Sequence, residues 1–171
     1  MENPGGHETR SILQEVAATF DDNVPNLYRM LARSQVALTA FVRFEDILER
    51  HGRLSRDEQA IVALEVAMSN RCNYCRGVMS REAREAGVAA DTVTAVLHGL
   101  EPMEPRYRFL VDATRRLMAD SGNLGQAEVV LFEERGVPFD ELLEIVSIIA
   151  AFTLATYANN LSRTRIDPEY R

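Results

Sequence analysis

The sequence predicts a single all-α domain, a helical bundle of about eight or nine helices that spans residues 1–171. Apolar residues recur every three or four positions through most of the chain, which is typical of amphipathic helices. No segment shows the sustained alternation that a half-buried strand would need. With 171 residues, 46% of them hydrophobic and 26% charged, the chain is long and apolar enough to bury a core of its own.

The first half of the chain contains clear start and stop signals for helices. One predicted helix ends near Phe20, and the next starts at Pro25, because proline is tolerated in a first helical turn. A longer apolar-periodic segment follows and stops at Gly52. Ser55 and Glu58 then form a Ser-x-x-Glu capping box, which predicts the start of a helix that runs to about residue 70.

The second half is divided by glycine and proline in the same way. A helix through the central cysteines stops at Gly87, and a short helix stops at Gly99. Another helix follows and ends at Gly122. The segments 125–136 and 138–162 complete the predicted bundle, and the isoleucine-rich stripe of the last one predicts core or a subunit interface.

Charge and composition exclude several classes of function. The net charge of −7 argues against nucleic-acid binding, which needs clustered positive charge. All 19 basic residues are arginine, so Schiff-base chemistry through a lysine amine is excluded. The chain does not begin like a secretory signal, and the apolar run 146–158 is short for a bilayer span. We therefore expect a cytoplasmic protein that does not act on a membrane.

Cys72 and Cys75 are the only cysteines, spaced C-x-x-C. Residues three apart share a helix face, and a position near a helix N-terminus lowers a thiol pKa, so the pair predicts redox chemistry. The alternative is two small buried hydrophobes. A zinc site would need further ligands, and no histidine lies near the pair, so we expect no metal and no cofactor. A thioredoxin-like site would need a βαβ context that the sequence lacks.

Glu65 is the single charged residue in the apolar segment "AIVALEVAM". On an apolar helix face, desolvation would raise its pKa and suit it to proton transfer. The alternative is that its carboxylate reaches solvent or an arginine at the edge of that face. On a continuous helix Glu65 would lie roughly 10 Å from Cys72, so direct contact requires a bend near Asn70, and otherwise a water molecule between them. For His98 and Tyr74 we expect structural roles, at a helix C-terminus and in packing.

These motifs resemble the carboxymuconolactone decarboxylase-like superfamily, in particular its alkylhydroperoxidase D-like, peroxidase-related branch. The similar segments are "NLYRMLARSQVALTAF", "LSRDEQAIVALEVAMSNRCNYC" and "GVPFDELLEIVSIIAAFTLATYANNLSRTRIDPE". The resemblance implies an all-helical, oligomeric protein. It also implies that Cys75 attacks a small-molecule hydroperoxide, that Cys72 condenses with the resulting sulfenic acid, and that a thiol reductant resets the disulfide.

The chain departs from the family motif at two positions. Active members carry a glutamate twelve residues before the first cysteine and a histidine four residues after the second. Here those positions hold Ala60 and Met79, and methionine cannot accept a proton. Where related sequences often read Asn-His near the C-terminus, this chain has Asn159-Asn160. The resemblance therefore implies thiol oxidoreductase activity with weakened base catalysis.

Two other readings stay open from the sequence. The first is a non-enzymatic member of the superfamily, an oligomeric scaffold or redox-sensing protein that retains the cysteines. The second is a lactone decarboxylase-like enzyme, which no residue supports directly and which the C-x-x-C pair disfavours.

Overall fold

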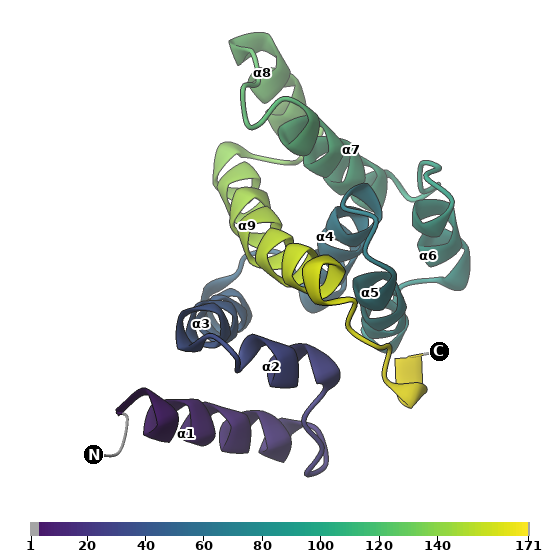
Figure 1. Cartoon of the computed structure of the whole chain (residues 1–171). Coiled ribbons are helices and arrows are strands. Elements are labelled where there is room, and N and C mark those ends of the chain that lie inside the picture. The colour runs from purple at the N-terminus through teal and green to yellow at the C-terminus, as the bar shows by residue number, and fades with distance from the viewer. Residues whose placement is uncertain (1–3, 171) are drawn as a thin grey trace.

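A computed structural model describes residues 4–170, and within that range it is helical, without strands (Figure 1). The predicted all-α class is confirmed, and the described residues form nine α-helices. Their bounds are α1 Pro4–Thr19, α2 Asn26–Leu31, α3 Gln35–His51, α4 Arg56–Ser69, α5 Asn73–Glu85, α6 Ala90–Leu97, α7 Pro105–Ala119, α8 Gln126–Glu134 and α9 Phe139–Ser162, with a 3₁₀ turn η1 at Pro168–Tyr170.

The helices start and stop for the local reasons that the sequence indicates. The capping box of α4 is formed, with the Ser55 backbone N–H donating to the Glu58 carboxylate at 2.9 Å. Gly87 follows α5 with a φ of +98°, a conformation in which glycine carries no steric penalty. Gly52 ends α3 differently: its backbone is extended, and a Cβ there would lie 2.5 Å from the Leu48 carbonyl oxygen. Close packing, and not a left-handed turn, therefore selects glycine at the end of α3.

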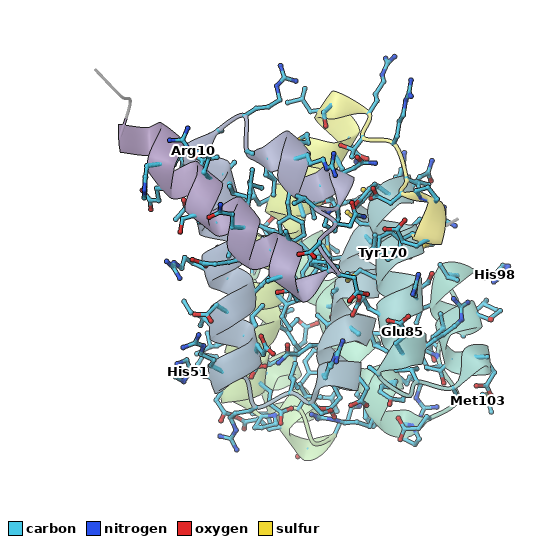
Figure 2. The ribbon with its side chains drawn as sticks, turned by 90° about the horizontal axis from the view of Figure 1, so that it is seen from below. Arg10, His51, Glu85, His98, Met103 and Tyr170 are labelled. Atoms are coloured by element: carbon cyan, nitrogen blue, oxygen red, sulfur yellow. The ribbon has the colours of Figure 1, made fainter. Side chains whose placement is uncertain are left out.

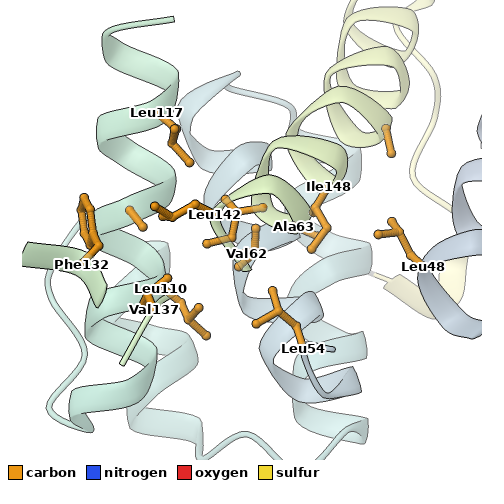
Figure 3. Close-up of a cluster of buried hydrophobic side chains, with 13 residues drawn as sticks. Leu48, Leu54, Val62, Ala63, Leu110, Leu117, Phe132, Val137, Leu142 and Ile148 are labelled. Atoms are coloured by element: carbon orange, nitrogen blue, oxygen red, sulfur yellow. The ribbon is translucent and has the colours of Figure 1, made fainter. Parts of the chain in front are cut away.

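Helix α4 is the centre of the domain. Its residues from Ala60 to Ala67 are all buried, and it packs against α5, α6, α7 and α9. One core cluster joins α4 to α7 and α9 through Val62, Leu110, Ile145 and Ile148, which are fully buried (Figure 3). Each such side chain contributes about 1.5–3 kcal/mol by leaving water. This burial fixes α4, and with it the position at which α5 begins.

A second layer, made of α1, α2 and α3, packs onto α9 through α2 and α3 (Figure 1). Its core includes Tyr28 and Phe41, whose ring centroids lie 5.9 Å apart, and both cysteines belong to the same cluster. The 3₁₀ turn η1 packs on α5, where the Arg81 guanidinium carbon lies 5.5 Å from the centroid of the Tyr170 ring; Tyr170 is labelled in Figure 2. The cysteines are therefore enclosed by segments from both ends of the chain.

Helix α9 is longer than the apolar run in the sequence indicates. It has 24 residues with a mean hydropathy of 1.6 over its most apolar window, so by length and composition it could cross a membrane. We expected the apolar segment to be too short to span a bilayer because we counted only residues 146–158, and for the length of the helix this expectation was wrong. A core helix passes the same test, and α9 buries Leu142, Ile145, Ile148, Ala151 and Ala155 against its neighbours.

Candidate functional site

The site is built at the junction between α4 and α5. Helix α4 ends at Ser69, and the backbone turns through Arg71, which has a φ of +52°. Asn70 anchors this turn to α9: its side chain donates to the Thr156 hydroxyl at 3.0 Å, and its carbonyl accepts from Asn160 at 2.9 Å. The bend near Asn70 that the sequence analysis required is therefore present.

Cys72 is the residue immediately before α5 and caps it. The backbone N–H of Cys75 donates to the Cys72 sulfur at 3.3 Å, and the thiol of Cys75 hydrogen-bonds the same sulfur. Both cysteines are reduced and buried, with exposed fractions of 1% and 3%. The two thiols therefore lie side by side at the start of α5, protected from bulk solvent.

Asn159 of α9 completes the immediate surroundings of the thiols. Its Nδ2 donates to the Cys75 sulfur at 3.3 Å, and the side chain is 98% buried. Its Oδ1 is buried and has no hydrogen-bond partner among the described residues. An unpaired buried acceptor costs roughly 1–3 kcal/mol, so this oxygen is available to a donor that arrives at Cys75.

The two thiols differ in their acidity. The hydrogen bond from the Cys75 thiol lowers the pKa of Cys72 well below its ordinary value; burial opposes this, and the N–H groups of Cys75 and Tyr74 add to it. The same hydrogen bond raises the pKa of Cys75, burial raises it further, and Asn159 partly offsets the rise. When one proton leaves the pair, the thiolate therefore forms on Cys72, where the N–H groups at the start of α5 stabilise it.

Cys75 lies on the wall of a partly open cavity of about 70 Å³. Of the two cysteines, Cys75 and not Cys72 is among the described residues of that wall. A water molecule needs roughly 10–15 Å³, so the cavity admits a small molecule. Most of the remaining lining is apolar or aromatic, namely Phe20, Pro25, Leu27, Tyr28, Phe41, Tyr74, Val78, Met79, Phe152, Ala155 and Tyr170, with the carboxyl groups of Glu45 and Glu82.

Met79 occupies the cavity wall one helical turn after Cys75. This is the position at which the family resemblance implies a histidine. Ala60, at the position where the resemblance implies a glutamate, is buried beside a groove of about 780 Å³ that shares lining residues with the cavity. The two departures in the sequence therefore fall on the walls of one continuous region around Cys75.

Glu45 of α3 is a cavity residue that our sequence reasoning missed. Both of its carboxylate oxygens accept from the Tyr28 hydroxyl, at 2.8 and 3.1 Å. Burial raises the pKa of Glu45 to about 7; the Tyr28 hydrogen bond opposes this rise, and Glu82 and Glu49 add to it. The signal was its spacing, since Glu45 lies four residues after Phe41, on the apolar face of α3.

Glu65, the carboxylate that the sequence analysis selected, lies elsewhere. It is buried, with an exposed fraction of 4%, and its Oε2 accepts from Arg115 of α7 at 3.0 Å. Its Oε1 accepts from the Ser69 hydroxyl at 3.2 Å. Glu65 is not among the described residues that line the cavity. The structure brings Cys72 and Cys75 together but gives Glu65 an arginine partner, which was the alternative considered for it.

Tyr74 and His98 have the structural contacts that were expected. The Tyr74 hydroxyl donates to Asp167 at 2.6 Å and accepts from the Leu27 N–H at 3.2 Å, and burial raises the pKa of Tyr74. Tyr74 thus ties α5 to α2 and to the C-terminal segment. His98 caps α6, with its Nδ1 2.8 Å from the Thr94 carbonyl oxygen. Across residues 4–170, no cluster of three or more His, Cys, Asp or Glu side chains could hold a metal ion.

Comparison with known proteins identifies a family that matches part of the chain. Residues 36–115 match the carboxymuconolactone decarboxylase family. No curated protein matches the chain.

Two solved structures share the fold over nearly the whole chain. One is an alkylhydroperoxidase AhpD core, an uncharacterized peroxidase-related protein from Ralstonia eutropha JMP134, with 22% identity and a TM-score of 0.86 over 96% of this chain and 87% of its own. The other is an uncharacterized peroxidase-related protein from Silicibacter sp. TM1040, with 20% identity and a TM-score of 0.80 over 98% of this chain and 89% of its own. The chain therefore has the alkylhydroperoxidase D-like fold. The resemblance to the carboxymuconolactone decarboxylase-like superfamily is confirmed: residues 36–115 match the family, and the fold matches over nearly the whole chain.

Proposed function

We propose that this protein is a thiol oxidoreductase that reduces small hydroperoxides by cycling Cys72 and Cys75 between dithiol and disulfide. The observation that carries the proposal is the pair itself: two reduced cysteines lie together at the start of α5, and one of them lines a cavity. The peroxidase-related names of the two structural neighbours are consistent with this chemistry.

Cys75 is the attacking thiol in this proposal, because it is the cysteine on the cavity wall. The Cys72 thiolate first takes the proton of Cys75, so Cys72 performs the task that a histidine at position 79 would perform. The Cys75 thiolate then attacks the terminal oxygen of the hydroperoxide. An S–O bond forms, the O–O bond breaks, Cys75 becomes a sulfenic acid, and the departing alkoxide takes a proton to become an alcohol.

The second step closes the disulfide. The sulfur of Cys72 attacks the Cys75 sulfenic acid, the S–S bond forms, and water leaves. The unpaired Oδ1 of Asn159 is suited to accept a hydrogen bond from the sulfenic hydroxyl while this occurs. A thiol reductant then returns two electrons and two protons to the pair.

The absence of a histidine at position 79 lowers the reaction rate expected in this scheme. A well-placed general base contributes roughly 10²–10⁴-fold, and a second cysteine with a lowered pKa recovers part of that factor. We therefore expect slow but measurable turnover.

Intact mass after addition of one equivalent of cumene hydroperoxide tests the proposal. The wild type should lose about two daltons, for one disulfide, and neither single cysteine variant should do so. Cys72→Ser should instead gain about sixteen daltons, because its Cys75 sulfenic acid has no partner. Wild-type thiols that stay reduced under excess peroxide would favour the alternative of a non-enzymatic, oligomeric member of the superfamily.

Assembly and cellular location remain proposals. We propose a homo-oligomer, in which the exposed apolar side chains of α9 such as Leu143, Val146 and Leu161 would be covered. Light scattering of the purified chain measures its mass in solution. A cytoplasmic location, where thiol reductants are available, fits reduced cysteines.

A further inference from the structure

We propose that Glu45 is the general acid of the hydroperoxide reaction, donating the proton that the departing alkoxide receives, and that Tyr28 positions its carboxyl group. This inference rests on the proposed function, since it assigns a proton source to the O–O cleavage step. It concerns a helix outside the C-x-x-C motif, 30 residues before Cys75.

The placement of Glu45 carries the inference. Glu45 and Cys75 come from different helices, α3 and α5, and line the same cavity. A hydroperoxide bound in this cavity would have both the thiol and the carboxyl group among its surroundings. Glu45 also lines the adjoining groove, as do Tyr28, Met79 and Phe152. Its carboxyl group is therefore exposed to both the cavity at Cys75 and the groove beside it.

Glu82 is the other carboxyl group on the cavity wall, and its surroundings differ. Its carboxylate forms an ion pair with Arg56 at 3.3 Å. Glu45 has no cationic partner among the described residues, and its oxygens meet the neutral Tyr28 hydroxyl instead. A carboxyl group in these surroundings holds a proton near neutral pH, consistent with the raised pKa of about 7 of Glu45.

With Glu45 as the proton donor, every proton in the reaction is accounted for. Before reaction the site holds the Cys72 thiolate, the Cys75 thiol and the protonated Glu45. The Cys75 proton moves to Cys72, the Cys75 thiolate attacks the peroxide, and the alkoxide takes the proton of Glu45. The products are the alcohol, the Cys75 sulfenic acid, the Cys72 thiol and the Glu45 carboxylate. Water then leaves as the disulfide forms, and solvent reprotonates Glu45.

Several ionisable groups surround Glu45 and would influence its titration. They are Tyr28 of α2, Glu49 and Asp46 of α3, Glu15 of α1, Arg56 of α4, Tyr74, Cys75 and Glu82 of α5, and Tyr170 of η1. Two of these groups shift the pKa of Glu45 in opposite directions, and each can be removed by a single substitution. The Tyr28 hydrogen bond lowers the pKa of Glu45, whereas the charge of Glu82 raises it.

The test compares peroxides whose leaving groups differ in basicity. Pre-steady-state oxidation of the reduced protein is followed with cumene hydroperoxide, which releases a basic alkoxide, and with peracetic acid, which releases acetate and needs no proton. Glu45→Gln should slow the cumene hydroperoxide reaction by roughly 10–100-fold and the peracetic acid reaction by less than about threefold. Glu133→Gln, which changes an exposed carboxylate on α8, is the control and should leave both rates unchanged.

The pH dependence of the oxidation rate distinguishes a proton donor from a residue that only packs, because loss of a packing contact would not shift the pH profile. With cumene hydroperoxide, the wild-type rate should rise as the cysteine pair ionises and fall as Glu45 loses its proton near pH 7. The falling limb should be absent in Glu45→Gln, move to higher pH in Tyr28→Phe, and move to lower pH in Glu82→Gln. The last two variants keep Glu45, so they test the inference even if Glu45→Gln fails to fold.

The outcomes separate this inference from the proposed function. A wild type that reacts with neither peroxide overturns both. A wild type that reacts, with Glu45→Gln slowed equally toward the two peroxides or not slowed at all, leaves the thiol chemistry standing and removes Glu45 from it. Tyr28→Phe and Glu82→Gln profiles that coincide with the wild type would have the same consequence for Glu45.

Discussion

Replacement of Glu45 by glutamine should change the pH dependence of stability in a direction that the structure dictates. In the unfolded chain this carboxyl group has the ordinary pKa of 4.5, and in the folded protein burial raises its pKa to about 7. Between these values the folded state holds a proton that the unfolded state has lost. The wild type therefore loses stability as the pH rises from about 4.5 to 7, and the loss is complete above that window.

The size of the effect follows from the same two values. At about 1.4 kcal/mol per pKa unit, the rise from 4.5 to about 7 corresponds to on the order of 3 kcal/mol. Glutamine is neutral throughout and lacks this dependence. At pH 5 the two proteins should differ by about 1 kcal/mol or less, because a neutral amide replaces a neutral acid of the same shape. At pH 8 the glutamine variant should be the more stable protein.

Urea unfolding followed by circular dichroism, with the thiols kept reduced, measures this directly at pH 5, 6, 7 and 8. The difference in unfolding free energy between Glu45→Gln and wild type should grow by up to about 3 kcal/mol across the series. Other titrating groups are common to both proteins and cancel in the difference. A constant difference across this range would show that Glu45 is not held in a desolvated site, and the reasoning about its proton would fail.

Three further substitutions probe the surroundings of the site. Met79→His should speed oxidation by hydroperoxide about tenfold or more, because it restores a base beside Cys75; an unchanged rate in stopped-flow assays would mean that the base is not limiting. Arg115→Met should cost roughly 3 kcal/mol in urea unfolding by leaving buried Glu65 without its ion pair, while oxidation keeps the wild-type rate; a slowed oxidation would return Glu65 to the reaction. Gly77→Ala should displace the C-terminal turn, since a Cβ would lie 2.8 Å from the Tyr170 carbonyl oxygen, and should speed tryptic cleavage near the C-terminus; equal cleavage would show that the turn does not rest on Gly77.

The local parts of this structure could be predicted from the sequence. Helix ends follow from short-range chemistry, such as the Ser55–Glu58 capping box and the left-handed Gly87, so they are legible in a few consecutive residues. Cys72 and Cys75 are three residues apart, and their closeness needs only one helical turn. The same holds for Met79, which lies one turn further on the same face of α5.

The remaining parts of the site depend on contacts between distant segments. Asn159 reaches Cys75 across 84 residues, and Glu65 finds Arg115 across 50, so no local pattern could pair them. The spacing of Glu45 from Phe41 places it on the apolar face of α3, but its hydrogen bond to Tyr28 depends on the packing of α2 against that face. The sequence therefore predicts the reactive thiols, whereas tertiary packing selects the groups that handle their protons.

The most direct test of the central claim is the intact mass of the reduced wild-type protein after one equivalent of cumene hydroperoxide, measured beside Cys72→Ser. The account predicts a loss of about two daltons in the wild type and a gain of about sixteen daltons on Cys75 in the variant. A wild-type mass that does not change under excess peroxide would contradict it.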